Sequence, residues 1–234
     1  MKISYVHLYS SSLLTSSLIR GVSEYLHELF PIVKIDIRSF SYYFEKSMIE
    51  EDVVDNKMVL LSHDFLNTAH QHELQNKSND IGQKITVIDG FYLQRIYSKI
   101  IDENETQLDH LHIIFEDNLI CTYDENDQRY HARPLICGSP SIISIAGIVE
   151  GPAKPKGYYF KLILKDLLSI NSKEVENEFA NRFIGYDDPR LVQAATGYAI
   201  QSIFFFLLMV THSVRIILVD CLILIGRKNY FILK

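Results

Sequence analysis

The residue types best suited to chemistry lie between positions 121 and 133. Residues 124–127 read Asp-Glu-Asn-Asp, and the next segment places a basic or titratable side chain at every second position: Arg129, His131 and Arg133. In an extended strand these three side chains share one face, because successive side chains point to opposite faces. Such groups repel one another unless an anion or carboxylates face them. Two interpretations stay open: ion pairs with Asp124, Glu125 or Glu150, or bidentate arginine binding of a substrate carboxylate.

The carboxylates of this segment have two interpretations of their own. Asp124, Glu125 and Asp127 have the chemistry for acid–base catalysis or for binding a hard cation. Asp and Asn are also ordinary turn residues, because their side chains bond to nearby backbone groups. The sequence favours a solvated turn and leaves the catalytic interpretation open.

Histidines occur in two closely spaced pairs, His70 with His72 and His110 with His112. Each pair would share one face of an extended segment. Isolated pairs of this kind are more often surface or capping residues than metal ligands, and we predict that role for both. A zincin needs His-Glu-x-x-His on a helix. The helix predicted over residues 197–204 reads Gly-Tyr-Ala-Ile-Gln-Ser-Ile-Phe and contains neither residue type.

The elements that must position these residues predict a single α/β (α+β) domain. A strand near residues 2–8, a helical stripe over 13–30 and an alternating segment over 32–38 predict a right-handed βαβ unit. A strand at 84–88 precedes a helix at 91–101. Residues 111–123 and 129–137 flank the polar turn and predict a β-hairpin. A strand at 141–149 and helices at 158–170, 173–184 and 188–207 complete a mixed β-sheet with a helical C-terminal third.

Composition excludes several classes of protein. Hydrophobic residues make up 47% of the 234 residues and charged residues 22%, which is enough for a packed core. The net charge of −6 provides no basic surface for nucleic acid. No Gly-x-Gly-x-x-Gly or P-loop motif supports nucleotide binding. Three cysteines form no disulfide framework, which favours a reducing compartment. We therefore predict a cytoplasmic location, without a signal peptide.

The C-terminal segment differs in composition from the rest. Twenty of the last 32 residues are Phe, Leu, Ile, Met or Val. A membrane span is disfavoured because His212, Arg215 and Asp220 interrupt the apolar run. The five residue types share T at the second codon position, so an out-of-frame translation also produces this excess. We predict one domain over residues 1–204 and an aberrant, frameshifted segment over 205–234. Resequencing codons 200–234 and measuring the C-terminal mass tests this prediction.

Four blocks of the chain resemble a known family. They are residues 121–133 (CTYDENDQRYHAR), 139–144 (SPSIIS), 150–155 (EGPAKP) and 187–191 (DDPRL). They are similar to an archaeal family of metallopeptidase-like proteins of unknown function, remotely related to the archaemetzincins. The resemblance covers most of residues 1–204. Members usually continue into a tail of the form G-x-P-F-C-x4-C-R-L-x-N-x-H-W-Q, which the alternative reading frame permits and this chain lacks.

The resemblance implies a zinc metallopeptidase-like protein that acts on a peptide or protein substrate. In an active member a polarised water would attack the peptide carbonyl. Glu125 or Asp127 would transfer protons, and Arg129 or Arg133, beside His131, would orient the substrate. The resemblance implies zinc for full-length relatives only. Without a His-Glu-x-x-His or Cys/His ligand set, we predict that the chain is inactive as written. The alternative is a non-catalytic binding module that uses the Arg129, His131 and Arg133 face for an anionic ligand or a partner protein.

Overall fold

The central feature of the fold is a five-stranded sheet in the order β2-β1-β4-β8-β7. The computed structural model describes residues 3–10, 12–39, 87–168 and 171–210. The first four strands run parallel to one another, and β7 is antiparallel to β8. The strands are β1 (Tyr5–Ser10), β2 (Lys34–Ser39), β4 (His110–Glu116), β7 (Leu135–Ile136) and β8 (Ser141–Ser144).

The chain begins with the predicted βαβ unit. Helix α1 (Leu13–Leu29) connects β1 to β2, and these strands pair in parallel from Tyr5 opposite Lys34 onwards. Helical spacing places Ile19, Val22 and Leu26 on one face of α1, and all three are fully buried. Burial of this apolar face against the sheet explains why the crossover forms here.

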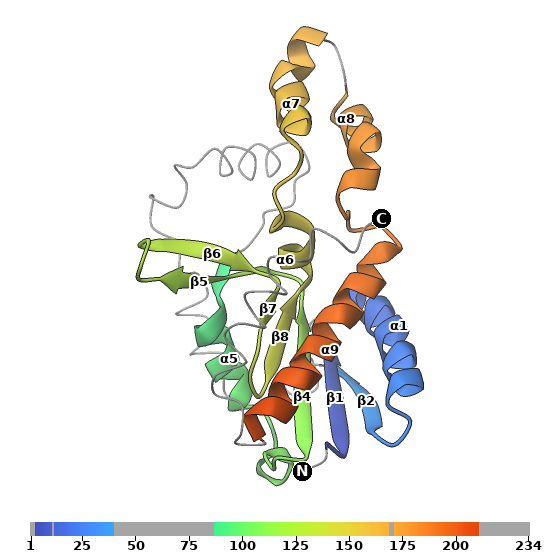
Figure 1. The fold of residues 1–234 in the computed structure, drawn as a ribbon, viewed down its shortest axis with the longest axis vertical. Coiled ribbons are helices and arrows are strands. Elements are labelled where there is room, and N and C mark those ends of the chain that lie inside the picture. Colours follow the sequence, from blue (N-terminus) through green and yellow to red (C-terminus); the bar gives the residue numbers. More distant parts are fainter. Residues whose placement is uncertain (1–2, 11, 40–86, 169–170, 211–234) are drawn as a thin grey trace.

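Helices α1 and α9 (Arg190–Val210) cover one face of the large sheet (Figure 1). Leu191, Ala195, Ala199 and Ile203 of α9 lie in the same hydrophobic core as α1 and as the side chains of β1 and β4 that point to this face. By length and composition alone, α9 could cross a membrane, with a mean hydropathy of 1.6. In this structure one face of α9 packs in the hydrophobic core, and 39% of the apolar window is buried.

A second, three-stranded sheet and helix α5 (Gly90–Ser98) lie at the other face. The small sheet has the order β3 (Val87–Asp89), β5 (Leu119–Asp124) and β6 (Arg129–Arg133). Leu93 and Tyr97 of α5 pack against Ile114 and Ile142 of the large sheet. The side chain of Asp89 accepts a hydrogen bond from the backbone nitrogen of Tyr92 at 2.7 Å and caps α5, as its position between strand and helix predicts.

Three predicted strands are divided in the structure. Residues 111–123 break after Glu116, where that buried carboxylate accepts bonds from Asn118 and from the hydroxyl of Tyr97. Strand β4 therefore belongs to the large sheet and β5 to the small one. Residues 129–137 break at Pro134, which has no backbone N–H for a ladder. The strand predicted over 141–149 ends at Ser144, whose hydroxyl caps α6 (Ile145–Glu150).

The C-terminal third is helical, as predicted. It contains α7 (Lys156–Leu168), α8 (Ser172–Phe179), a short 3-10 helix η3 (Ala180–Arg182) and α9. Figure 1 shows α7 and α8 projecting from the sheet, around a small core of Tyr158, Val175 and Phe179. Helix α9 continues past residue 204 to Val210, and residues 211–234 lie outside the described part of the chain. The boundary at 204 stays a prediction.

Candidate functional site

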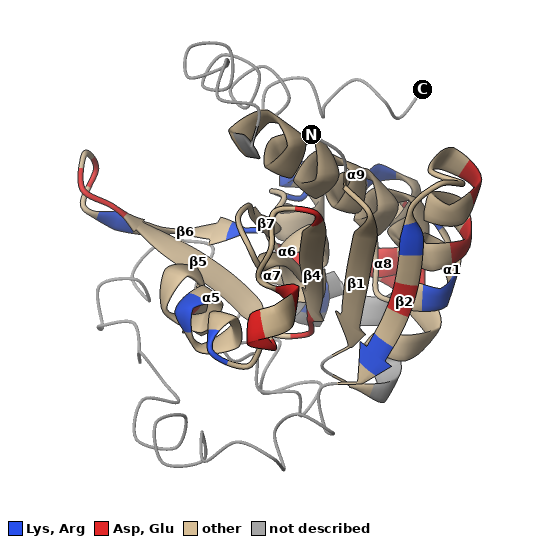
Figure 2. Ribbon diagram, turned by 90° about the horizontal axis from the view of Figure 1, so that it is seen from below, with Lys and Arg blue, Asp and Glu red and all other residues tan. Residues whose placement is uncertain are grey.

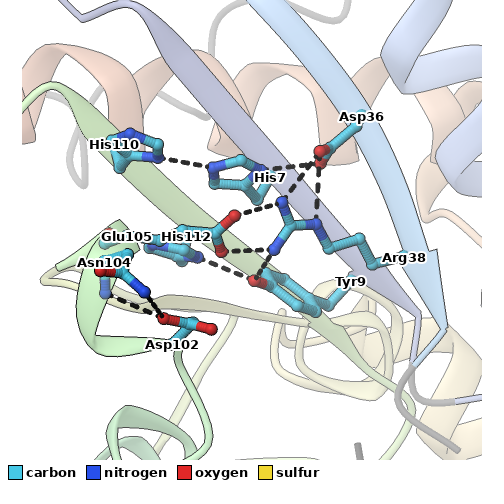
Figure 3. A network of polar contacts seen from close by, with 9 residues as sticks. All are labelled: His7, Tyr9, Asp36, Arg38, Asp102, Asn104, Glu105, His110 and His112. Carbon is cyan, nitrogen blue, oxygen red and sulfur yellow. Dashed lines mark hydrogen bonds and ion pairs between the residues drawn. The ribbon is translucent and has the colours of Figure 1, made fainter. Parts of the chain in front are cut away.

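A cluster of polar side chains lies on the face of the large sheet that does not contact α1 and α9. Its members, here called the sheet cluster, come from three adjacent strands and from the 3-10 helix η2 (Glu103–Glu105): His7, Tyr9, Asp36, Arg38, Glu105, His110 and His112 (Figure 3). Strand alternation explains the placement, because Val6 and Leu8 point into the core while His7 and Tyr9 point the other way. Figure 2 shows the matching alternation of charged residues along β2.

His7 joins two other side chains of the cluster. Its Nδ1 lies 2.8 Å from Oδ1 of Asp36, and its Nε2 lies 2.9 Å from Nδ1 of His110. A carboxylate only accepts hydrogen bonds, so Nδ1 of His7 carries the hydrogen. The His7 side chain is 3% exposed and that of His110 is 15% exposed. The two rings therefore share a single hydrogen between facing nitrogens at the edge of a buried region.

His112 is held as a neutral imidazole. Its Nε2 donates to the backbone oxygen of Glu105 at 2.9 Å, because a carbonyl can only accept. Its Nδ1 therefore accepts from the hydroxyl of Tyr9 at 2.9 Å. Burial lowers the pKa of His112 to about 4, although the bond to Glu105 opposes this shift. At neutral pH His112 contributes no charge to the sheet cluster.

Arg38 is the cation of the sheet cluster. It donates to both carboxylate oxygens of Glu105, at 2.5 and 2.8 Å, and to Asp36 at 3.0 Å. The bond to Glu105 raises the pKa of Arg38 and lowers the pKa of Glu105. Partial burial acts to raise the pKa of Asp36, but the hydrogen bonds from His7 and Arg38 outweigh it and lower that pKa. Both carboxylates are therefore ionised at neutral pH.

Two groups of side chains in the described residues have metal-ligand chemistry. The first lies in the sheet cluster, where nitrogen or oxygen atoms of His7, Glu105 and His110 lie within 4.8 Å of one another. Two imidazoles and a carboxylate are ligand types that Zn²⁺ takes in proteins. The second group is Asp124, Asp127 and His131 at the β5–β6 turn, within the same distance.

The hairpin group is more exposed and is accounted for by turn chemistry. Oδ1 of Asp124 accepts from the backbone nitrogen of Asn126 at 2.9 Å, and this bond lowers the pKa of Asp124. Asp127 accepts from the backbone nitrogen of Arg129 and lies 2.7 Å from Nε2 of His131. Figure 2 shows the acidic turn at the end of the projecting hairpin. These bonds support the interpretation as a solvated turn.

The predicted functional residues lie together on this hairpin. Strands β5 and β6 pair in antiparallel register, and Asp124 lies opposite Arg129. The Nε of Arg133 donates to the hydroxyl of Thr122 at 2.9 Å, and Glu150 is bonded to Lys154. Glu125 lies at the exposed turn. The roles proposed for Glu125, Asp127, Arg129, His131 and Arg133 in a reaction stay predictions.

The surface role predicted for His112 is wrong, whereas His110 is partly exposed and its predicted surface or capping role is not contradicted. His112 is fully buried, and both histidines belong to the sheet cluster. No sequence motif connects His7, the Asp36 and Arg38 pair, and Glu105, because long stretches of chain separate them. The available signal was strand parity: charged residues occupy every second position from Lys34 to Arg38 in β2, and His110 and His112 share one face of β4. The pair His70 and His72 lies outside the described residues.

Helix α9 does not offer the ligands of a zincin. Residues 190–210 contain no His, Cys, Asp or Glu. The fold is that of an α/β protein, and the sheet cluster contains a histidine–carboxylate group with metal-ligand chemistry. The chain belongs to the family described as "Probable metallopeptidase family (DUF6775)", whose model matches residues 2–213. No curated protein and no solved structure matches the chain significantly. The frameshift predicted within 205–234 stays a prediction.

Proposed function

We propose that this member of the metallopeptidase family, with the amino-acid sequence given, does not cleave peptides through a zincin centre. One observation carries the proposal: the inward face of α9 is filled by apolar side chains. Ala195, Ala199 and Ile203 follow one another at single-turn spacing and are at most 4% exposed. Two ligating imidazoles need this same spacing. A face of alanines and isoleucine packed in the core holds neither a metal nor the glutamate that activates water.

The expected result is an absence of zinc-dependent hydrolysis. Untagged protein with added Zn²⁺ should cleave a mixed peptide library no faster than protein treated with EDTA, measured by mass spectrometry of the products. Cleavage that EDTA abolishes and Zn²⁺ restores would overturn the proposal. A parallel preparation from cells that do not express the protein separates activity of this chain from a contaminating peptidase. Loss of activity in a His110→Asn variant would assign it to the sheet cluster.

A second candidate function is binding of an anionic ligand by the hairpin. The observation that favours it is the shared face of Arg129, His131 and Arg133, on which both arginines are exposed. Guanidinium groups bind carboxylates bidentately. We expect a short acidic peptide to bind the protein, and the double variant Arg129→Ala, Arg133→Ala to bind at least about tenfold more weakly, since charged hydrogen bonds contribute roughly 1.5–3 kcal/mol each. Equal binding of the wild-type protein and the double variant in a fluorescence anisotropy titration would exclude this function.

The cytoplasmic location also stays a prediction, which cell fractionation tests.

A further inference from the structure

We propose that His7, His110 and Glu105 form a binding site for a transition-metal dication, with Zn²⁺ as the best-suited ion. The site is separate from α9 and does not depend on peptidase activity. It combines nitrogen ligands from two adjacent strands with one carboxylate from η2, and Asp36 orients the first histidine (Figure 3). The following observations carry the proposal.

The two facing nitrogens already stand close to the spacing of metal ligands. Nε2 of His7 and Nδ1 of His110 are 2.9 Å apart and share one hydrogen. Nitrogens bound to tetrahedral zinc lie about 3.3 Å apart, given Zn–N distances of about 2.0–2.1 Å. An ion that replaces the shared hydrogen therefore needs an opening of only about 0.4 Å between the rings. Small rotations of the two side chains provide this movement.

The residues around His7 are those that orient a metal-binding imidazole. Asp36 accepts the hydrogen of Nδ1 at 2.8 Å, which leaves the lone pair of Nε2 directed at His110. A carboxylate behind a ligating histidine fixes its tautomer and raises its basicity. On the other side, the ring of Tyr5 stacks on His110 with centroids 4.4 Å apart. Contacts with Asp36 and Tyr5 thus orient both imidazoles before any ion binds.

Glu105 retains the capacity to bind an ion although Arg38 holds it. Each of its oxygens accepts one hydrogen bond from Arg38, and each carboxylate oxygen has a second lone pair. Its side chain is 24% exposed, so the ion can enter from this side. Three protein ligands leave a fourth tetrahedral position for water.

Charge and ligand type select the kind of ion. Asp36, Glu105 and Asp109, whose carboxylate lies 3.9 Å from Nε2 of His110, carry three negative charges against the single guanidinium of Arg38. Lys34 lies further out, over the ring of Tyr5. A dication therefore reduces the excess negative charge of the site. Imidazole ligands favour Zn²⁺ and its transition-metal neighbours over Mg²⁺ and Ca²⁺, which prefer oxygen.

Metal titration tests the site directly, without an activity assay. Untagged full-length protein is stripped with EDTA and titrated with Zn²⁺ in a calorimeter. Co²⁺ absorption provides a second readout of ligand geometry. We expect one zinc site, and a thermal midpoint that rises with Zn²⁺. Asp36→Asn removes only the residue that orients His7 and should weaken zinc binding roughly 10–100-fold. His110→Asn and Glu105→Gln each remove a ligand and should weaken zinc binding by more than this.

The matched control is His131→Asn in the hairpin group, which should leave zinc affinity unchanged. Loss of binding in His131→Asn with normal binding in His110→Asn would assign the ion to the hairpin and overturn the proposal. Wild-type protein that binds no Zn²⁺ would overturn it as well. Circular dichroism confirms that each variant is folded. If His110→Asn fails to fold, the zinc affinity of Glu105→Gln tests the proposal instead. The Glu105 side chain is partly exposed and glutamine is nearly isosteric with glutamate, so this variant should fold. Zinc binding without peptide cleavage would support both proposals, whereas zinc-dependent cleavage would overturn only the first.

Discussion

Replacing Phe115 with alanine is expected to lower the free energy of unfolding by about 3–5 kcal/mol. Phe115 lies on β4, is fully buried, and belongs to the core between the large sheet and helices α1 and α9. Its removal loses the transfer free energy of the ring and leaves a cavity that the strands on either side cannot close. Urea denaturation followed by circular dichroism measures the change.

The control for this prediction is the same substitution at Phe160, on helix α7. That ring is 63% exposed, so Phe160→Ala should change stability by no more than about 0.5 kcal/mol. Equal losses for the two variants would show that the core is not organised around β4. A larger loss for Phe160→Ala would show that the exposed face of α7 is covered in solution.

Alkylation of Cys121 at pH 8 is expected to be on the order of 10³ times slower in the folded protein than in the unfolded chain. Burial raises the pKa of Cys121 to about 12, and the side chain is fully buried. The thiolate is the reactive form, and its fraction at pH 8 falls from about 0.2 at an ordinary thiol pKa to about 10⁻⁴. Burial also raises the pKa of Cys137, to about 11, so this partly exposed thiol should react faster than Cys121.

The pH dependence separates a raised pKa from simple obstruction. Because deprotonation creates the thiolate, the rate should rise about tenfold per pH unit and should not level off below pH 10. Iodoacetamide labelling with peptide mass spectrometry resolves each cysteine, and the protein in concentrated urea provides the reference. A plateau for Cys121 near pH 8–9 would contradict the prediction.

Local patterns of the sequence determined most of the secondary structure. The βαβ unit, the hairpin and the helical C-terminal third follow from apolar periodicity, and the side chain of Asp188 accepts a bond from the backbone nitrogen of Arg190 at the start of α9. These signals act between residues a few positions apart, so one sequence suffices to predict them. The apolar inward face of α9 likewise follows from the helical spacing of Ala195, Ala199 and Ile203.

Only the tertiary structure decided how residues 111–149 are divided between two sheets. At the break after Glu116, the carboxylate of that residue accepts a bond from Tyr97, which lies on helix α5. Periodicity alone treats β4 and β5 as one continuous apolar strand. The bond from Asn118 is local, but the bond from Tyr97 spans 19 positions, and no local pattern predicts it.

The sheet cluster was also decided by tertiary structure. His7, Asp36 and His110 are separated by 29 and 74 positions (36 − 7 and 110 − 36), and parallel pairing of β2, β1 and β4 places them side by side. Sequence alone determined that these residues point to one face of their own strands. Strand order and register, set by burial of the opposite apolar faces against α1 and α9, brought the three faces together. A polar cluster built across parallel strands can therefore be recognised only in the folded chain.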